Sequence, residues 1–386
     1  MRRPSRWRGP GLRALPGILA LATACGDPPR PGAVPQGTRE LDGRTAVTPA
    51  PALVDLTGAG ATFPYPLYAR WFGNYGWREG TRINYLAVGS GEGIRQLQAG
   101  TVDFGAADVP LAAAPSARAT PAARAQAART LQLPMVLGAV AVTYQLERTA
   151  PLHLSGTVLA DIFLGRITRW DDPRLAALNP GAPLPALPIR VIHRDDESGT
   201  TYIFSDYLSA VSPAWAQTAG RGATLSWPVG SGSAGNEGVA GSVKQTPGAI
   251  GYVEVVYARQ NRLPVARLQN RAGRFVAPTP FEIASAATAG VGALEGDRWM
   301  TASLVDAPGA SSYPLVAFSW LLLDPEAIGA AKARQLRDFV QWALTEGVEV
   351  ATPMGYVPLP SVLAAGVQAR LDRALGIPAP SGAAPR

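Results

Sequence analysis

Four loops rich in Gly, Ser and Thr could bind an oxyanion, and each precedes a pattern typical of a helix. They read GATFPYPLY, VGSGEGIRQL, DESGTTYIF and SGSAGNEGVAGSV. The first turn of a helix offers unpaired backbone N–H groups and a positive dipole end. Glycine lets backbone approach a ligand closely, and hydroxyls add donors. Such residues also cap ordinary helices, so four loops together favour an anion site only modestly.

The third loop is also unusually charged. The stretch IHRDDESGTTYIFSDYL places one arginine and three acids directly before a Ser-Gly-Thr triplet. An anion site accounts for the arginine and the triplet. It does not by itself account for the acids.

Other kinds of site find less support. TGAGATF lacks G-x-x-x-x-G-K-[ST], and Phe63 stands where G-x-G-x-x-G needs its last glycine. The only histidines, His153 and His193, are far apart in the sequence, so no metal or other cofactor is expected. His193 lies close to Ser198 in sequence, but one histidine near a serine usually reflects chance. We therefore expect no enzyme activity.

Composition indicates a globular protein of more than one domain. The chain has 386 residues, 47% hydrophobic and 16% charged. The net charge is +7, but five arginines precede residue 25, which leaves 7 − 5 = +2 for the remainder. A nearly balanced mature chain gives no support to nucleic-acid binding by bulk charge.

The N-terminus has the pattern of an export signal. An Arg-rich start precedes the apolar run ALPGILALATA, which is too short to span a bilayer comfortably. The run ends at LATAC, which resembles a bacterial lipoprotein box, although Ala22 stands where that box prefers leucine. We expect a signal peptide over residues 1–24, lipidation of Cys25 and a Pro/Gly-rich tether over 25–52. Plain secretion is the alternative, and a lone cysteine excludes an intramolecular disulfide.

Strand-like and helical stretches alternate through the rest of the chain, which predicts βαβ units and a mostly parallel sheet. DLTGAGATF, TRINYLAVGSG and VDFGAADVPL read as strands followed by turns, and PYPLYARWFGNYGW reads as a helix with an aromatic core face. Two long apolar runs, 133–146 and 313–324, are each expected to form a buried strand between lobes. The economical architecture is two α/β lobes, the second inserted into the first.

The motifs LTGAGATFPYPLYARW, NYLAVGSGEGIRQLQAGTVDFGAADVPL, RDDESGTTYIFSDYL and PGAIGYVEVVYA occur in this order. From about residue 54 to 365 the chain resembles the periplasmic phosphate-binding proteins of bacterial high-affinity phosphate ABC transporters. The resemblance implies an α/β, two-lobe periplasmic-binding-protein architecture with mixed, mostly parallel sheets and a ligand cleft between the lobes. Lobe I would comprise 53–140 and 312–376, lobe II 141–311, and 377–386 would be a disordered tail.

The resemblance also implies a function. The protein would bind inorganic phosphate and deliver it to the permease and ATPase subunits of an ABC transporter for import. It would be an exported monomer, in the periplasm or at the cell surface, that meets the membrane only through its lipid anchor. The alternatives are a secreted phosphate-ester hydrolase on the same scaffold and a surface-anchored phosphate sensor or adhesin.

The same resemblance assigns residues to roles. Phe63 would donate its backbone N–H, Arg194 would contact the phosphate, and Asp196 would hold Arg194 from behind. The complete implied phosphate-binding set is Thr62, Phe63, Ser90, Asp108, Arg194, Ser198, Gly199 and Thr200.

Asp108 is the acid that the resemblance places against the ligand, and its chemistry gives it a purpose. Phosphate near neutral pH keeps at least one O–H, which an ionised carboxylate can accept. Sulfate has no such proton, so its oxygens and the carboxylate oxygens would face each other as acceptors with no hydrogen between them. Unpaired buried polar groups cost several kcal/mol, so we expect a preference for phosphate on the order of 10³-fold.

Three acids depart from the family pattern. In the second loop the family has a serine followed by two glycines after the ligand-binding serine, whereas this chain has Gly91 and Glu92 there. If Glu92 pointed outward from the first helical turn, its charge would interact favourably with the helix dipole. If Glu92 pointed inward, phosphate affinity would fall as pH rises. Asp195 and Glu197 stand where the family often has small residues, and both are expected to face solvent.

Overall fold

The computed structural model describes residues 54–147, 151–291 and 302–377. The predicted signal peptide over 1–24, Cys25 with the tether over 25–52, and residues 378–386 of the predicted tail over 377–386 lie outside these ranges. The helices in these ranges include none with the length and hydropathy of a membrane span.

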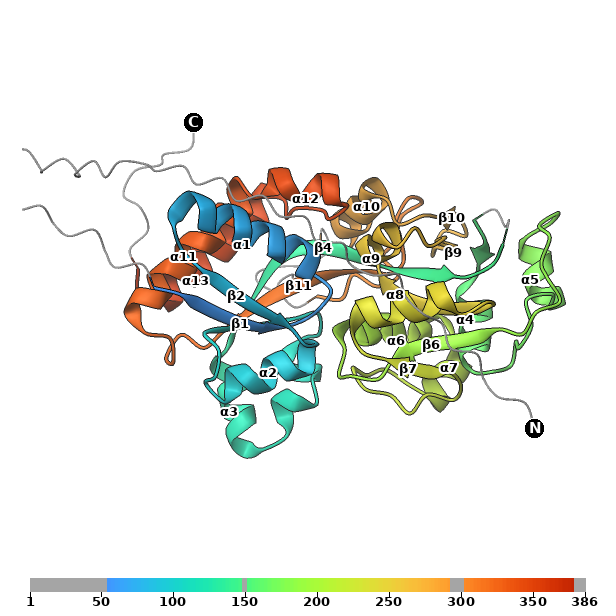
Figure 1. Ribbon diagram of the computed structural model, residues 1–386, viewed down its shortest axis with the longest axis horizontal. Coiled ribbons are helices and arrows are strands. Elements are labelled where there is room, and N and C mark those ends of the chain that lie inside the picture. Colours follow the sequence, from blue (N-terminus) through green and yellow to red (C-terminus); the bar gives the residue numbers. More distant parts are fainter. Residues whose placement is uncertain (1–53, 148–150, 292–301, 378–386) are drawn as a thin grey trace, which may run out of the picture. The chain divides into compact units, whose positions relative to one another are not determined.

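The main feature of the described residues is an eight-stranded sheet in the order β2-β1-β3-β11-β4-β8-β6-β7 (Figure 1). A small second sheet has the order β10-β9-β5. The strands are β1 Leu56–Gly60, β2 Ile83–Ala87, β3 Phe104–Ala107, β4 Leu131–Tyr144, β5 His153–Leu154, β6 Arg190–Arg194, β7 Ser231–Ser233, β8 Ala249–Glu254, β9 Arg267–Gln269, β10 Phe275–Val276 and β11 Val316–Leu323.

Helices fill most of the connections between these strands (Figure 1). They are α1 Tyr65–Glu79, α2 Ser90–Gln98, α3 Pro121–Arg129, α4 Gly156–Phe163, α5 Pro173–Leu178, α6 Gly199–Val211, α7 Pro213–Thr218, α8 Gly235–Gln245, α9 Val255–Gln260, α10 Pro280–Val291, α11 Ala330–Thr345, α12 Val348–Met354 and α13 Ser361–Ala374. Two short 3₁₀ segments cover Leu111–Ala113 and Ser116–Arg118.

Strand pairing confirms the predicted mixed, mostly parallel α/β fold. β1 pairs in parallel with β2 and β3, and β6 pairs in parallel with β7 and β8. In the main sheet, antiparallel pairing is confined to the contacts of β11 and β4. The sheet therefore has two parallel wings joined by a central antiparallel pair.

Strand β4 joins the two wings. Its residues from Leu131 to Ala139 pair with β11, whereas those from Val140 to Tyr144 pair with β8. The apolar run 133–146 thus forms the predicted buried crossing strand. The run 313–324 also forms a buried strand, β11, whose partners in the main sheet are β3 and the first part of β4. We call the wing containing β1, β2 and β3 lobe I, and the wing containing β6, β7 and β8 lobe II.

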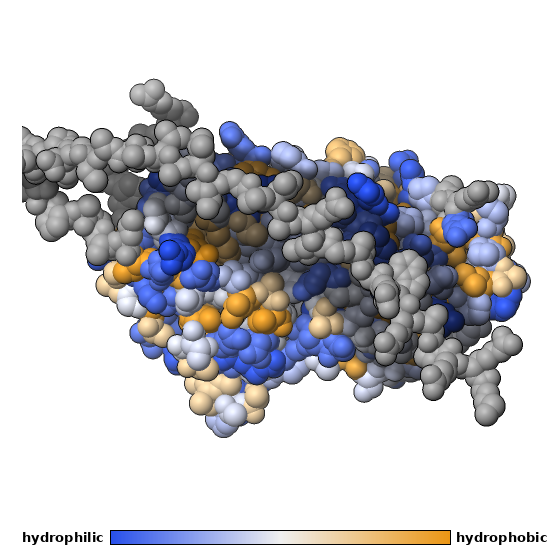
Figure 2. Space-filling model, in the orientation of Figure 1, coloured by the Kyte–Doolittle hydropathy of each residue, from blue (hydrophilic) through white to orange (hydrophobic). Residues whose placement is uncertain are grey.

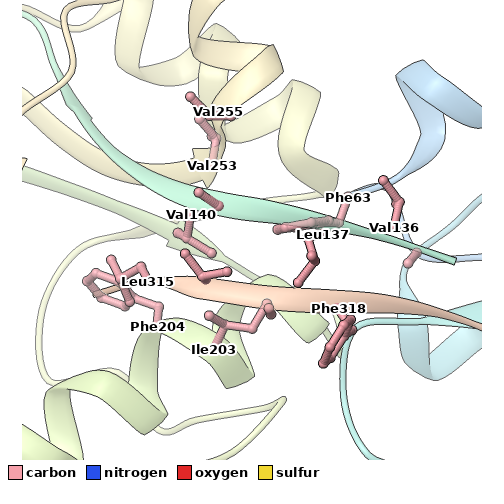
Figure 3. Close-up of a cluster of buried hydrophobic side chains, with 14 of the residues drawn as sticks. Phe63, Val136, Leu137, Val140, Ile203, Phe204, Val253, Val255, Leu315 and Phe318 are labelled. Atoms are coloured by element: carbon pink, nitrogen blue, oxygen red, sulfur yellow. The ribbon is translucent and has the colours of Figure 1, made fainter. Parts of the chain in front are cut away.

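One hydrophobic core continues along the central strands. Figure 3 shows Leu137 and Val140 of β4 beside Leu315 and Phe318 at β11. Side chains from α6 and from the end of β8 meet the same cluster. The predicted aromatic face of α1 is also confirmed, because its buried residues are Leu67, Tyr68, Trp71, Phe72 and Tyr75.

Hydrophilic and hydrophobic residues alternate over the visible surface, and hydrophobic residues gather near β2 and α2 (Figure 2). Leu86 of β2 is 58% exposed, and Val88 just after it is 40% exposed. β2 is an edge strand of the main sheet.

Candidate functional site

All four predicted Gly/Ser/Thr loops lead into helices, namely α1, α2, α6 and α8. The first, second and fourth loops follow β1, β2 and β7, and the third follows β6. In open α/β sheets, ligands bind beyond the carboxyl ends of the parallel strands. The loops from both wings end at such an edge, so the fold places them where a ligand site is expected.

Ser90, at the start of α2, joins the loops of the two lobes. Its Oγ accepts a hydrogen bond from the backbone N–H of Gly199 at 3.2 Å and from that of Asp108 at 3.3 Å. A Cβ at position 199 would lie 2.6 Å from the Asp108 Cβ. Glycine is therefore required at 199, because any side chain would separate the lobes.

Thr62 and Thr200 meet around Asn236, and all three are buried. The Asn236 side-chain amide donates to Thr62 Oγ1 at 2.8 Å and to Thr200 Oγ1 at 3.2 Å. Thr62 lies after β1 in lobe I, whereas Thr200 and Asn236 begin α6 and α8 in lobe II. The two lobes therefore share one network of buried hydroxyls.

Arg194 ends β6 and is 3% exposed. Its Nε donates to Asp196 Oδ1 at 2.6 Å, and its Nη2 donates to the other carboxylate oxygen. The N–H of Gly235, at the start of α8, also donates to Asp196 Oδ1 at 3.3 Å. A bidentate pair of this kind fixes the plane of the guanidinium. The side chain of Asp196 thus lies against Arg194.

Asp108, directly after β3, is the buried acid beside this network. It is 2% exposed, and its Oδ1 accepts a hydrogen bond from Ser319 Oγ at 2.7 Å. Burial raises the pKa of the Asp108 carboxyl from its ordinary value of 3.8 to about 7, although Ser319 and the charge of Arg194 favour the ionised form. Asp108 can therefore accept or donate a proton near neutral pH.

Phe63 and Ser198 are held by contacts that leave little freedom. The Phe63 ring is buried on β4, where a Cβ at Gly138 would come within 2.4 Å of it (Figure 3). The Tyr356 hydroxyl donates to the Phe63 carbonyl at 2.7 Å. Ser198 caps α6 by accepting from the N–H of Thr201 at 3.1 Å. These contacts fix the backbone at both helix starts.

The expectation that Glu197 faces solvent is wrong. Its side chain is 10% exposed and bonds across the lobes: it accepts from Ser116 N–H at 3.2 Å and Ser116 Oγ at 2.8 Å, and pairs with Arg95 Nη1 at 3.1 Å. A Cβ at Gly91 would lie 2.4 Å from the Glu197 Cβ, so glycine at 91 makes room for it. Asp195 is exposed as predicted.

Glu92 points away from the network. Its side chain is 38% exposed and accepts from Arg95 Nε at 3.0 Å and from Gln96 Nε2 at 2.9 Å. The Gln96 and Arg95 hydrogen bonds lower the pKa of the Glu92 carboxyl. The outward alternative is the one that the structure shows.

Three buried polar residues near the network were missed from sequence. Asn236 lies inside the fourth loop, SGSAGNEGVAGSV, in which the sequence indicated no individual site residue. Ser319 and Glu254 are polar residues within the apolar runs VAFSWLLL and AIGYVE. Burial raises the pKa of Glu254 well above its ordinary value. A polar side chain inside a buried strand was the available signal.

The structure gives His193 a role apart from Ser198. Its ring stacks on Trp227 with centroids 4.6 Å apart, and its Nδ1 bonds to the Arg194 carbonyl at 3.0 Å. Burial lowers the pKa of the ring. Among the described residues, no group of three or more His, Cys, Asp and Glu is arranged to hold a metal ion.

Comparison with known proteins places the chain in a family. Residues 45–346 match the PBP superfamily domain. The chain is 44% identical over 317 residues to the phosphate-binding protein PstS of Pasteurella multocida, which covers 82% of this chain and 89% of that protein. It is 41% identical over 315 residues to PstS of Haemophilus influenzae, with coverage of 79% and 89%.

Solved structures agree on the fold. A phosphate-bound structure of the periplasmic phosphate-binding protein PfluDING matches with a TM-score of 0.64 at 23% identity, covering 82% of this chain and 93% of that one. A phosphate-bound ABC transporter substrate-binding protein from Clostridium perfringens matches with a TM-score of 0.57 at 16% identity, covering 80% and 100%. The chain therefore belongs to the PstS phosphate-binding proteins of the PBP superfamily and has their two-lobe fold.

Proposed function

We propose that this protein binds inorganic phosphate between its two lobes and delivers it to an ABC transporter for import. The observation that carries the proposal is the convergence of loops from both lobes on one buried network. That network combines one guanidinium, several hydroxyls and a single facing carboxyl. The relatives named phosphate-binding protein PstS support the same ligand.

The phosphate-binding residues in this proposal are those assigned from sequence. Thr62 and the Phe63 N–H donate from lobe I together with Ser90, and Asp108 accepts the phosphate proton. The remaining site residues come from lobe II: Arg194, Ser198 and Thr200 donate, whereas Gly199, whose N–H donates to Ser90 Oγ, lets the backbone approach the anion closely. Helix N-termini and hydroxyls share the anion's charge, so that one arginine suffices.

Lobe closure is the proposed link to transport. We place lobe I at 53–140 and 312–376 and lobe II at 141–311, hinged at the central strands. The closed, phosphate-loaded form would dock on the permease, and opening would release the anion. A monomer suffices for this cycle, and no residue of the proposed site calls for a metal or other cofactor.

We further propose that the protein is exported and anchored through an acylated Cys25. The support is the LATAC sequence after an Arg-rich apolar start and before a Pro/Gly-rich tether. In membrane fractions of the expressing cell, Cys25→Ser is expected to move the protein to the soluble fraction. Retention of that variant in the membrane would contradict a Cys25 anchor.

The binding proposal is tested by isothermal calorimetry of the purified protein. Phosphate should bind one-to-one, and sulfate should give no measurable heat at pH 8. Binding of sulfate or molybdate without phosphate would overturn the proposal. Hydrolysis of p-nitrophenyl phosphate would instead support the phosphate-ester hydrolase.

A further inference from the structure

The fourth Gly/Ser loop supplies no donor to the proposed phosphate site, yet its asparagine is buried beside that site. Asn236 is 0% exposed, at the start of α8. Its Nδ2 donates to Thr62 Oγ1 at 2.8 Å and to Thr200 Oγ1 at 3.2 Å, and its backbone N–H donates to Thr62 Oγ1 at 3.2 Å. Asn236 therefore acts on hydroxyls that are themselves proposed to touch the ligand.

The orientation of the Asn236 amide follows from its other end. The backbone N–H of Glu254 lies 2.8 Å from Asn236 Oδ1. A backbone N–H can only donate, so the atom that faces it must be the oxygen. The NH₂ group consequently points at the two threonine oxygens, with one hydrogen for each.

These contacts restrict what the threonine hydroxyls can do. A hydroxyl has one donor hydrogen and two acceptor sites. Thr62 Oγ1 accepts twice from Asn236, and Thr200 Oγ1 accepts from Asn236 and, at 3.4 Å, from Arg194 Nη1. With both acceptor sites filled, each hydroxyl keeps only its O–H for a further partner.

Ser90 follows the same rule with backbone donors. Its Oγ accepts from the N–H groups of Gly199 and Asp108, which leaves its own O–H to donate. For Ser90 the main chain fills both acceptor sites. For Thr62 and Thr200 a single side chain does much of this work, and a side chain can be removed by mutation.

We propose that Asn236 is a positioning residue that sets the Thr62 and Thr200 hydroxyls as donors toward the bound phosphate. This inference rests on the proposed function. Phosphate oxygens that face the hydroxyls require hydrogen-bond donors. Hydroxyls that already point their O–H toward the anion avoid the free-energy cost of reorienting when phosphate binds. Because Thr62 belongs to lobe I and Asn236 to lobe II, the setting is completed only when the lobes meet.

The test is a double-mutant cycle read by phosphate calorimetry. Asn236→Ala should weaken phosphate binding by about 10- to 100-fold, since a hydrogen bond to a charged group contributes about tenfold or more. In a Thr62→Val/Thr200→Val background, Asn236→Ala should cost less than about threefold, because the hydroxyls that it orients are gone. A merely structural role would cost the same in both backgrounds.

A matched control separates stability from binding. Asn179 is another buried asparagine, and it bonds the backbone of His153 at 2.8 and 3.0 Å. Asn179→Ala should lower the melting temperature and leave the phosphate affinity within about twofold. Asn236→Ser, which keeps a smaller polar group, supplies the same cycle if Asn236→Ala does not fold.

The outcomes separate the two proposals. If the unmodified protein binds phosphate but the double-mutant cycle is additive, the role of Asn236 is overturned and the proposed function is not. An Asn236→Ala affinity within twofold of the unmodified protein also overturns it. No phosphate binding by the unmodified protein overturns both this inference and the proposed function.

Discussion

Two regions join the lobes in contrasting ways. The anion seat, made by Thr62, Ser90, Asp108, Arg194, Thr200 and Asn236, is buried and consists mainly of neutral hydrogen-bonding groups around one arginine. The rim contact, made by Glu197 with Ser116 and Arg95, includes an ion pair whose arginine is 52% exposed. Exposed ion pairs are screened by water and salt, whereas buried polar networks are costly to break.

Anion recognition belongs to the seat, whereas the rim contributes only to closure of the lobes. The seat must distinguish anions, so its groups are fixed in position and in donor or acceptor character. The rim touches no proposed ligand atom and adds only to the stability of lobe contact. Substitutions in the seat should therefore change affinity and selectivity strongly, and those at the rim should change affinity slightly.

The largest expected effect is that of Arg194→Ala. Truncating one partner of a buried, hydrogen-bonded charge pair costs about 2–5 kcal/mol of binding free energy, so phosphate affinity should fall on the order of 10²-fold. The variant also leaves the Asp196 carboxylate without its charge partner near the anion. Calorimetry checks this, with Arg95→Ala at the rim as control. Similar losses for both arginines would contradict the distinction between seat and rim.

Asp108→Asn should change selectivity more than phosphate affinity. The amide can donate to sulfate, so the preference for phosphate should fall from about 10³-fold to about tenfold or less. Competition between phosphate and sulfate at pH 8 measures the ratio. An unchanged ratio would show that Asp108 does not distinguish phosphate from sulfate through the O–H of the anion.

Acid pH should imitate that substitution. Because burial raises the pKa of Asp108 to about 7, the carboxyl of the folded protein is mostly neutral below that pH and ionised above it. A neutral carboxyl donates its O–H to sulfate, so sulfate affinity should rise as pH falls from 8 to 5.5. Titration of sulfate at both pH values measures this rise. The rise should be absent in Asp108→Asn, and its persistence there would assign it to another group.

The smallest expected effect is that of Glu197→Gln. The amide keeps an acceptor for Ser116 but loses the charge that pairs with Arg95. An exposed pair contributes about 0.2–1 kcal/mol, so phosphate affinity should fall up to about fivefold, and less in high salt. Glu79→Gln, which removes the charge of an exposed acid paired with Arg78, is the control and should leave affinity unchanged. A loss of phosphate affinity that is the same at low and high salt would argue against an ion-pair contribution.

The sequence predicted much of the fold because its signals are local. Alternating strand and helix patterns, and apolar runs such as 133–146, depend on neighbouring residues, and the structure confirms them. The four Gly/Ser/Thr loops were likewise predicted as helix starts. The family resemblance then assigned Asp108 and Arg194 to one site, which spacing alone could not do.

Side-chain direction was harder to predict. Glu197 was expected to face solvent because acids usually do so, but Gly91 leaves space for it against lobe I. Ser319 bonds Asp108 from a strand 211 residues away. Neither contact has a local signal in the sequence.

The order of residues supplies the groups that the site can use: Arg194, several hydroxyls, helix starts that contain glycine, and an acid after β3. Tertiary structure alone decided which hydroxyls donate, because a hydroxyl takes its direction from the partners that fill its acceptor sites. For Thr62 those partners come from Asn236, 174 residues away in the other lobe. The physical reason is that hydrogen-bond direction is set by contact in space, whereas the sequence lists only the groups that can make it.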